Sequence, residues 1–241
     1  MDFALTEEQQ MFQQLFRDFA TKEVAKVADQ TDKKEEVPAR LIKRAASQGF
    51  LAALAPEEPY GGAGLDFTTY TLLIEAMAAE CASTALLLHV HNGLSLRTIV
   101  QHGTEPAKEK LLPEMVAGER IGAFALTEAT AGSDPTQLRT TARRENGDYI
   151  LNGSKTWVSN GGIAGVFVIF AATEPAAGAR GISAFAVPAE AEGLVVGQRE
   201  KTLGMRGASI TRLYLRDVRV PADHLLGSEG AGYRIALEAL D

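Results

Sequence analysis

Two short stretches of the sequence combine hydroxyl groups, glycines and one aromatic ring in a pattern that suits ligand binding. The first runs from Phe124 to Asp134, where an apolar segment ends in Thr127 and Glu128 and is followed by small residues that let the backbone curl closely around a ligand. Free amides and hydroxyls at such a strand-to-loop turn bind an electron-rich heteroaromatic ring or a phosphate. A hairpin connection in which Ser133 and Asp134 merely cap a turn explains the composition equally well.

The second stretch runs from Asn152 to Gly162 and contains the only tryptophan of the chain. Trp157 stands two residues before Ser159, so a strand would present both side chains on one face. Such a pair could provide a flat wall and a hydroxyl for a planar ligand. A plain core tryptophan is the simpler interpretation, and it holds unless the two stretches meet in the fold.

Other chemistries find little support in the sequence. No phosphate-binding GxxxxGK[ST] loop, GxSxG nucleophile elbow, HExxH zinc motif or CxxC pair occurs. His89 and His91 are two residues apart in a helical stretch and point to different sides, which is poor geometry for joint metal ligation. Cys81 lies in an apolar stretch without a neighbouring base, which favours an inert thiol. We therefore predict no metal site.

The composition is that of an ordinary soluble globular protein, with 46% hydrophobic and 23% charged residues among 241. Lys and Arg number 24 against 31 Asp and Glu, a net charge of −7 without basic runs, which disfavours nucleic acid as a partner. A single cysteine and a start, residues 1–5, without signal-peptide character predict a reducing cytoplasm. The longest apolar run, Ile163 to Ala172, is too short to span a membrane.

The chain divides into a helical and a strand-rich half. Thr6 and Gln9 form a capping box that predicts the start of a long helix, and helical spacing continues to about residue 119. Short β-branched runs separated by turn residues then predict an antiparallel β domain, a barrel or a sandwich, over 120–228. Residues 229–241 turn helical again. The expected fold class is α+β, with a helical domain at 1–119 followed by the β domain.

Several segments, taken together and in order, resemble the acyl-CoA dehydrogenase family. The most specific are FALTEATAGSD from Phe124 and NGSKTWVSNGG from Asn152, which are similar to the two flavin-contacting segments of that family. Further similar segments are PEEPYGGAGLD at 56–66, HGTEPAKEKLLPEMVAGE at 102–119, KTLGMRGAS at 201–209 and DVRVPADHLLGSEGAGY at 217–233. The resemblance covers essentially the entire chain.

The resemblance implies FAD as cofactor and an acyl-CoA thioester as substrate, desaturated between Cα and Cβ. The residues that it implies for cofactor binding are Phe124, Leu126, Thr127, Ser133, Trp157, Val158 and Ser159. Within this set, Trp157 and Val158 are expected along the isoalloxazine ring, and the Ser159 hydroxyl at flavin N5. Ser133 and Asp241 are expected to contact the substrate.

The family has a further C-terminal helical bundle, of which residues 229–241 match only the start. The resemblance therefore implies that this chain lacks a catalytic residue, because the family's glutamate base lies beyond Asp241, and that the chain alone is inactive. It also implies a homotetramer of fatty acid metabolism that passes electrons to an electron-transfer flavoprotein. Two alternatives stay open. One is a non-catalytic flavin- or CoA-ester-binding or assembly subunit, and the other is a flavin oxidase or monooxygenase of the same fold.

Overall fold

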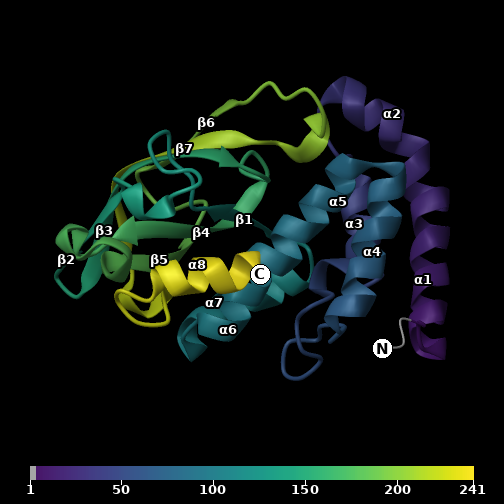
Figure 1. Ribbon diagram of the computed structural model, residues 1–241, viewed down its shortest axis with the longest axis horizontal. Coiled ribbons are helices and arrows are strands. Elements are labelled where there is room, and N and C mark those ends of the chain that lie inside the picture. The colour runs from purple at the N-terminus through teal and green to yellow at the C-terminus, as the bar shows by residue number, and fades with distance from the viewer. Residues whose placement is uncertain (1–3) are drawn as a thin grey trace.

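The computed structural model describes residues 4–241, so the first part of the segment judged for signal-peptide character lies outside the described residues. The N-terminal part is helical, as the spacing predicted (Figure 1). Its helices are α1 (Glu7–Phe19), α2 (Ala25–Lys34), α3 (Ala39–Ser47), α4 (Phe67–Glu80), α5 (Ala82–His89), α6 (Arg97–His102) and α7 (Glu105–Val116). The capping box is confirmed: the Thr6 hydroxyl accepts the Gln9 amide, and the Gln9 side chain accepts the Thr6 amide.

Helices α1 to α5 pack together at one end of the molecule, whereas α6 and α7 lie beneath the sheet (Figure 1). Helix α4 is capped by the Asp66 carboxylate and buries Leu73 and Met77 fully, because its sequence is apolar on most sides. The short 3-10 turn η2 (Phe50–Ala52) adds Phe50 and Leu51 to this part of the core. Most of the apolar side chains between Thr68 and Gln101 are thus buried in helices.

Two segments widen into π-helix, which the hydrophobic spacing did not predict. They are η1 (Ala20–Val24), between α1 and α2, and η3 (Val90–Leu96), between α5 and α6. Within η3, Asn92 is fully buried and donates to the carbonyl oxygens of Phe50 and Leu88. Wide helical turns of this kind often occur at functional sites.

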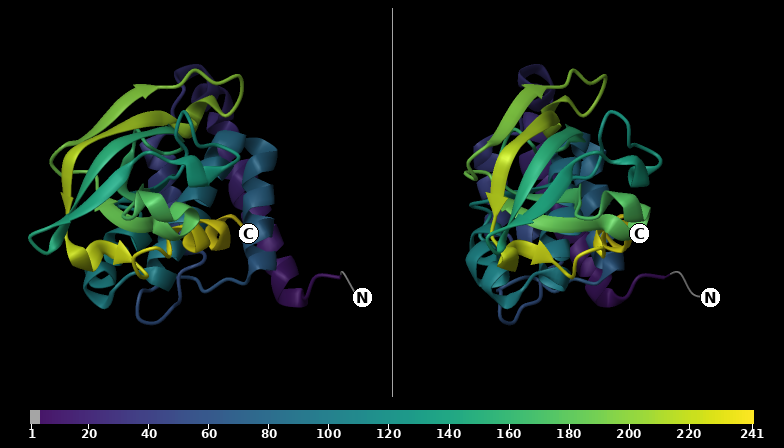
Figure 2. Two further views of the ribbon diagram at one scale, coloured as in Figure 1. Left: turned by 60° about the vertical axis from the view of Figure 1, so that its left-hand side comes forward. Right: turned by 90° about the vertical axis from the view of Figure 1, so that its left-hand side faces the viewer.

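The C-terminal part is built around one mixed sheet of eight strands (Figure 2). The strands are β1 (Ile121–Ala125), β2 (Thr141–Glu145), β3 (Asp148–Val158), β4 (Ala164–Ala172), β5 (Ile182–Pro188), β6 (Leu194–Arg199), β7 (Thr211–Val220) and β8 (Leu225–Leu226). Their order is β6-β7-β3-β2-β4-β5-β8, with β1 paired to β4. The α+β class is confirmed.

The expectation of a purely antiparallel barrel or sandwich is wrong in two respects. The sheet does not close into a barrel, because in the described chain its order ends at β6 and β8 without a pairing between them. Moreover, β1 runs parallel to β4, and β2 meets β4 in parallel at one position. Turn residues of the hairpin type indicate only that consecutive strands pair. They could not predict the pairing of β1 with a strand some 40 residues later in the chain.

Strand β4 lies at the centre of the sheet and is buried from Val166 to Ala172. It pairs with β5 from Val166 to Ala172 and with β1 on its other side. Its alternate residues belong to two hydrophobic clusters, one on each face of the sheet. Val166, Val168 and Phe170 pack on one face, and Phe167 and Ile169 pack on the other. Burial on both faces explains the near-continuous apolar sequence of this strand.

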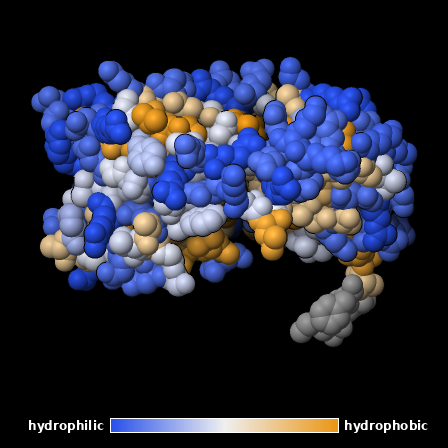
Figure 3. Space-filling view, turned by 90° about the horizontal axis from the view of Figure 1, so that it is seen from above, coloured by the Kyte–Doolittle hydropathy of each residue, from blue (hydrophilic) through white to orange (hydrophobic). Residues whose placement is uncertain are grey.

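The chain ends in helix α8 (Gly232–Leu240), which lies beside the sheet and points toward the helical part (Figures 1 and 2). Its residues Ile235 and Ala236 are fully buried, whereas Leu237 and Leu240 are 42% and 58% exposed. Seen from above, the surface is largely hydrophilic with scattered apolar patches (Figure 3). Within residues 4–241 no helix combines the length and the apolar character needed to cross a membrane.

Candidate functional site

The two ligand-binding stretches of the sequence meet at one cavity of about 380 Å³. Its walls come from the end of β1, the loop that follows β1, the end of β3, the π-helix η3 and the exposed side of α8. The lining residues are Val90, Leu94, Phe124, Leu126, Thr127, Gly132, Ser133, Pro135, Trp157, Ser159, Tyr233, Leu237 and Leu240. Six of the seven residues predicted for cofactor binding line this cavity.

Trp157 is directed into the cavity by an irregularity in β3. The register with β7 shifts between Lys155 and Val158, and Trp157 adopts a left-handed backbone with φ 57°. Such a bulge redirects a side chain, and here it leaves the indole 57% exposed. An exposed tryptophan at a strained backbone position is unusual in a core strand, so the plain core interpretation of Trp157 is wrong.

The same bulge turns Val158 the other way. Its side chain is fully buried in the cluster of Leu213 and Phe167 on the sheet, and it does not line the cavity. Only the backbone of Val158 is therefore left to face a ligand. The strand periodicity could not reveal this, because a bulge reverses the alternation of faces at one residue.

Ser159 follows β3 in a tight turn that a buried asparagine stabilises. Asn160 has φ 64° and donates from its side-chain amide to the carbonyl oxygens of Leu87 and Gly122, both at 3.1 Å. These bonds join the turn to α5 and to β1 at the same time. Asn160 is therefore a supporting residue of the site that the sequence analysis did not single out.

Strand β1 is seated directly on the π-helix η3. A side chain at Gly122 would bring its Cβ to 2.5 Å from Ser95 Cβ, so only glycine allows this approach. The Gly122 amide donates to Nδ1 of the fully buried His91 at 2.9 Å. Burial lowers the pKa of His91 to about 4, so this imidazole is neutral at pH 7 and acts as an acceptor.

Hydroxyl groups on the cavity wall are available to a ligand. Within residues 4–241, the hydroxyls of Thr127, Ser133 and Ser159 and the amide of Thr127 have no protein partner. The Thr127 carbonyl, in contrast, accepts the Thr156 amide at 2.9 Å, which ties the loop to β3. The cavity thus offers several uncommitted hydrogen-bonding groups next to a flat aromatic ring.

A second cavity of about 360 Å³ adjoins the first, because Leu94 and Leu240 line both. It contains Asp241, the residue predicted to contact substrate, and it reaches α4. There the Tyr70 hydroxyl lies 3.2 Å from His89 Nδ1. The other lining residues are Phe67, Thr71, Ile74, Gly93, Arg97 and Ala239.

The electrostatic centre of the site is a buried ion pair that the sequence analysis did not find. Lys155 on β3 and Glu128 in the loop after β1 lie 2.7 Å apart, with side chains 0% and 6% exposed. Burial raises the pKa of Glu128, but the Lys155 charge and hydrogen bonds outweigh it and the net change is downward. Burial lowers the pKa of Lys155 to about 8, which the Glu128 charge opposes. Both groups are ionised at pH 7.

Comparisons with known proteins agree with this architecture. Residues 6–119 match the model for "Acyl-CoA dehydrogenase, N-terminal domain", and residues 123–218 match that for "Acyl-CoA dehydrogenase, middle domain". The chain belongs to the acyl-CoA dehydrogenase family. This membership confirms the resemblance found in the sequence.

Individual members of the acyl-CoA dehydrogenase family align along nearly the whole chain. An acyl-CoA dehydrogenase of Bacillus subtilis is 42% identical over 98% of this chain and 62% of its own length. The structure of butyryl-CoA dehydrogenase from Megasphaera elsdenii superposes with a TM-score of 0.93, at 38% identity, over 100% of this chain and 63% of that one.

A glutaryl-CoA dehydrogenase from Mycobacterium smegmatis in complex with FADH2 superposes with a TM-score of 0.90, at 30% identity, over 98% of this chain and 59% of that one. The chain therefore spans about three-fifths of the length of the relatives that it matches.

Proposed function

We propose that the protein that carries this chain catalyses the FAD-dependent α,β-dehydrogenation of an acyl-CoA thioester to the trans-2-enoyl-CoA. The observation that carries the proposal is the single cavity at which the β1 loop, the end of β3 and helix α8 come together around Trp157. Family membership supports the reaction class, since the matched relatives are named acyl-CoA dehydrogenases.

The residues present fit a flavin. The cavity has an exposed indole as one wall and the free hydroxyls of Thr127, Ser133 and Ser159 on the others. A flavin ring needs an apolar flat surface and hydrogen-bond donors along its polar edge, and both are offered here. A related family member with FADH2 bound supports this choice of cofactor. When bound, FAD supplies the acceptor for the substrate hydride.

The polar groups of the chain have distinct roles in this proposal. The Thr127 amide and hydroxyl, together with the backbone of Phe124 and Leu126, hold the pyrimidine edge, where negative charge grows during reduction. Trp157 packs along the ring, with the Val158 backbone beside it. The Ser159 hydroxyl would donate to N5 of a bound flavin and so help to hold the ring in place for hydride transfer.

The second cavity is proposed as the continuation of the substrate site. Ser133 lines the first cavity and Asp241 the second, so both can contact one extended thioester. A short acyl group is supported by the related butyryl-CoA dehydrogenase. We place no catalytic residue in residues 1–241. The glutamate base is proposed to follow Asp241 in the whole protein, so that this part alone is inactive.

The electron acceptor and assembly belong to the same proposal. We expect an electron-transfer flavoprotein to reoxidise the protein, which a similar chain in a structure described as "Electron transferring flavoprotein of Acidaminococcus fermentans" supports. We further propose a homotetramer that works in fatty acid metabolism. The single free cysteine suits a reducing compartment such as the cytoplasm.

The deciding experiment is anaerobic mixing of the whole flavin-loaded protein with butyryl-CoA while the flavin absorbance is recorded. Bleaching of the flavin and formation of the enoyl product are expected. A flavin that stays oxidised while calorimetry detects CoA-ester binding would replace the proposal with the binding-subunit alternative. Rapid peroxide formation in air would instead indicate an oxidase.

A further inference from the structure

Lys155 occupies a place where a charged side chain is costly. It is fully buried in β3, and its ammonium has two acceptors, the Glu128 carboxylate at 2.7 Å and the Leu126 carbonyl oxygen at 3.2 Å. Replacement of a buried ion pair by apolar side chains of similar volume is often neutral or even stabilising. Global stability alone therefore does not explain why this pair lies beneath the cavity.

Glu128 connects both ends of the loop that carries Thr127 and Ser133 through hydrogen bonds. Its carboxylate accepts the Arg139 amide at 2.6 Å and the Thr140 amide at 3.1 Å. Its own backbone exchanges hydrogen bonds with Ala131 in a tight turn. The carboxylate thus closes the loop on itself, and the Lys155 ammonium attaches the closed loop to the strand that bears Trp157.

The second bond of Lys155 acts on one peptide group of the cavity wall. In a trans peptide the carbonyl and the following amide point in opposite directions, so the Leu126 carbonyl faces Lys155 and the Thr127 amide faces away from it. Leu126 and Thr127 both line the cavity, and the Thr127 amide has no acceptor within residues 4–241. A cation on the carbonyl polarises the whole peptide and makes that amide a stronger donor.

We propose that Lys155 is a positioning residue, which holds the Thr127–Ser133 loop against β3 and strengthens the Thr127 amide toward the negative charge that a flavin gains on reduction. The inference rests on the proposed function for the flavin, but the ordering of the loop belongs to the protein alone. It makes two separate predictions, one without cofactor and one with it.

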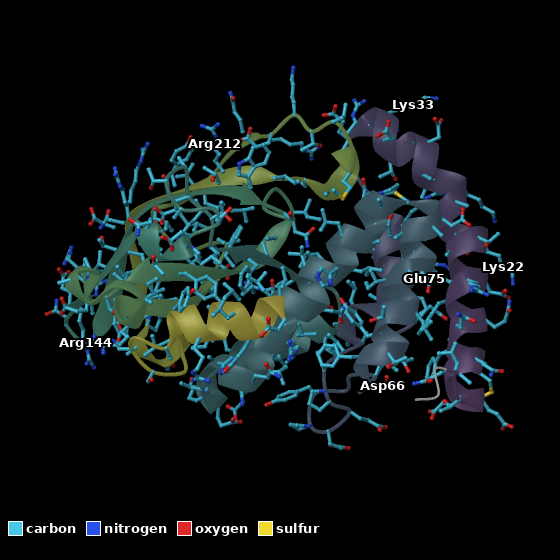
Figure 4. All side chains as sticks on the ribbon, in the orientation of Figure 1. Lys22, Lys33, Asp66, Glu75, Arg144 and Arg212 are labelled. Atoms are coloured by element: carbon cyan, nitrogen blue, oxygen red, sulfur yellow. The ribbon has the colours of Figure 1, made fainter. Side chains whose placement is uncertain are left out.

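The variants are Lys155→Met, which removes the charge at similar length, and the double variant Lys155→Met with Glu128→Gln, which leaves no unpaired buried charge. If the single variant fails to fold, the double variant decides. Lys33→Met is the matched control, because Lys33 forms an ion pair of the same 2.7 Å length with Asp29 but is 72% exposed (Figure 4). All variants are made in the whole protein.

The first measurement is hydrogen exchange of the flavin-free protein. The amides of Arg139, Thr140 and Thr156 anchor the loop, so we expect their exchange to become at least tenfold faster in the double variant and to stay unchanged in Lys33→Met. Wild-type exchange at these three amides in the double variant would overturn the positioning role. This result does not depend on whether the protein binds a flavin.

The second measurement is the midpoint potential of the bound flavin. In both Lys155 variants, we expect the ratio of the affinity for reduced flavin to the affinity for oxidised flavin to fall at least tenfold. This fall corresponds to a midpoint potential lower by about 30 mV for a two-electron couple. A purely structural role would weaken both redox forms equally and leave the potential unchanged. A wild-type potential in the double variant would therefore overturn the electrostatic part. If the wild type binds no flavin at all, the proposed function fails and this electrostatic part with it, while the exchange result still decides the positioning role.

Discussion

Replacement of His91 by glutamine is expected to flatten the dependence of the free energy of unfolding on pH between about 4 and 6.5. His91 is completely buried, and its Nδ1 accepts the Gly122 amide. Protonation would place a second donor opposite that amide and a charge in the core. The folded state therefore resists protonation, and burial lowers the pKa from 6.5 to about 4.

The sign follows from the protons bound in each state. Between these two pKa values the unfolded chain binds a proton at His91 and the folded chain does not, so stability rises with pH and is lost as the pH falls. The contribution of neutral His91 to the free energy of unfolding is fully present above pH 6.5. A pKa of about 4 against 6.5 corresponds to about 3 kcal/mol, of which about 2.5 kcal/mol should be lost on going from pH 7 to about pH 4.5.

The assay is urea unfolding of the wild type and of His91→Gln at both pH values. Glutamine keeps an acceptor but does not titrate, so the wild type should lose about 2.5 kcal/mol more than the variant over this interval. His89→Gln is the control, because His89 is exposed and its replacement should leave most of the difference in place. Equal losses in the wild type and His91→Gln would refute the assignment of a neutral buried imidazole.

Three further predictions concern the site. Ser159→Ala should slow flavin reduction by acyl-CoA at least tenfold while the substrate affinity changes little. Ser154→Ala, at an exposed position of β3, is the control, and equal effects on both steps would contradict a role at N5. Trp157→Ala should weaken FAD binding by roughly fivefold to tenfold in a fluorescence titration, and an unchanged affinity would exclude ring stacking. Asn160→Ala should lower the free energy of unfolding by about 2 kcal/mol, because two buried carbonyls lose a donor; a loss below about 0.5 kcal/mol would refute this support.

Much of the fold could be predicted from local sequence patterns. The Thr6 capping box located the start of the first helix, which begins at Glu7. Strand positions followed from β-branched runs. These signals are local, since caps, turns and periodicity depend on residues within a few positions of one another.

The features that the sequence did not reveal depend on distant contacts. Glu128 and Lys155 are 27 residues apart, and nothing in either neighbourhood distinguishes a buried ion pair from a solvated one. The left-handed backbone of Trp157 and the resulting burial of Val158 depend on the bulge against β7. For the site, family resemblance predicted six of the thirteen residues that line the cavity. The lining contributed by η3 and α8, and the groups that support the lining, became visible only in three dimensions.

The parallel pairing of β1 with β4 has a consequence for the order in which the parts of the protein fold during synthesis. As the chain is synthesised, Ile121–Ala125 emerges well before Ala164–Ala172, so β1 can rest on η3 while its hydrogen-bonding edge still lacks a partner. A nascent intermediate with an exposed strand edge is prone to association with other chains. The sheet of the second half is therefore expected to form only after β4 has been released from the ribosome.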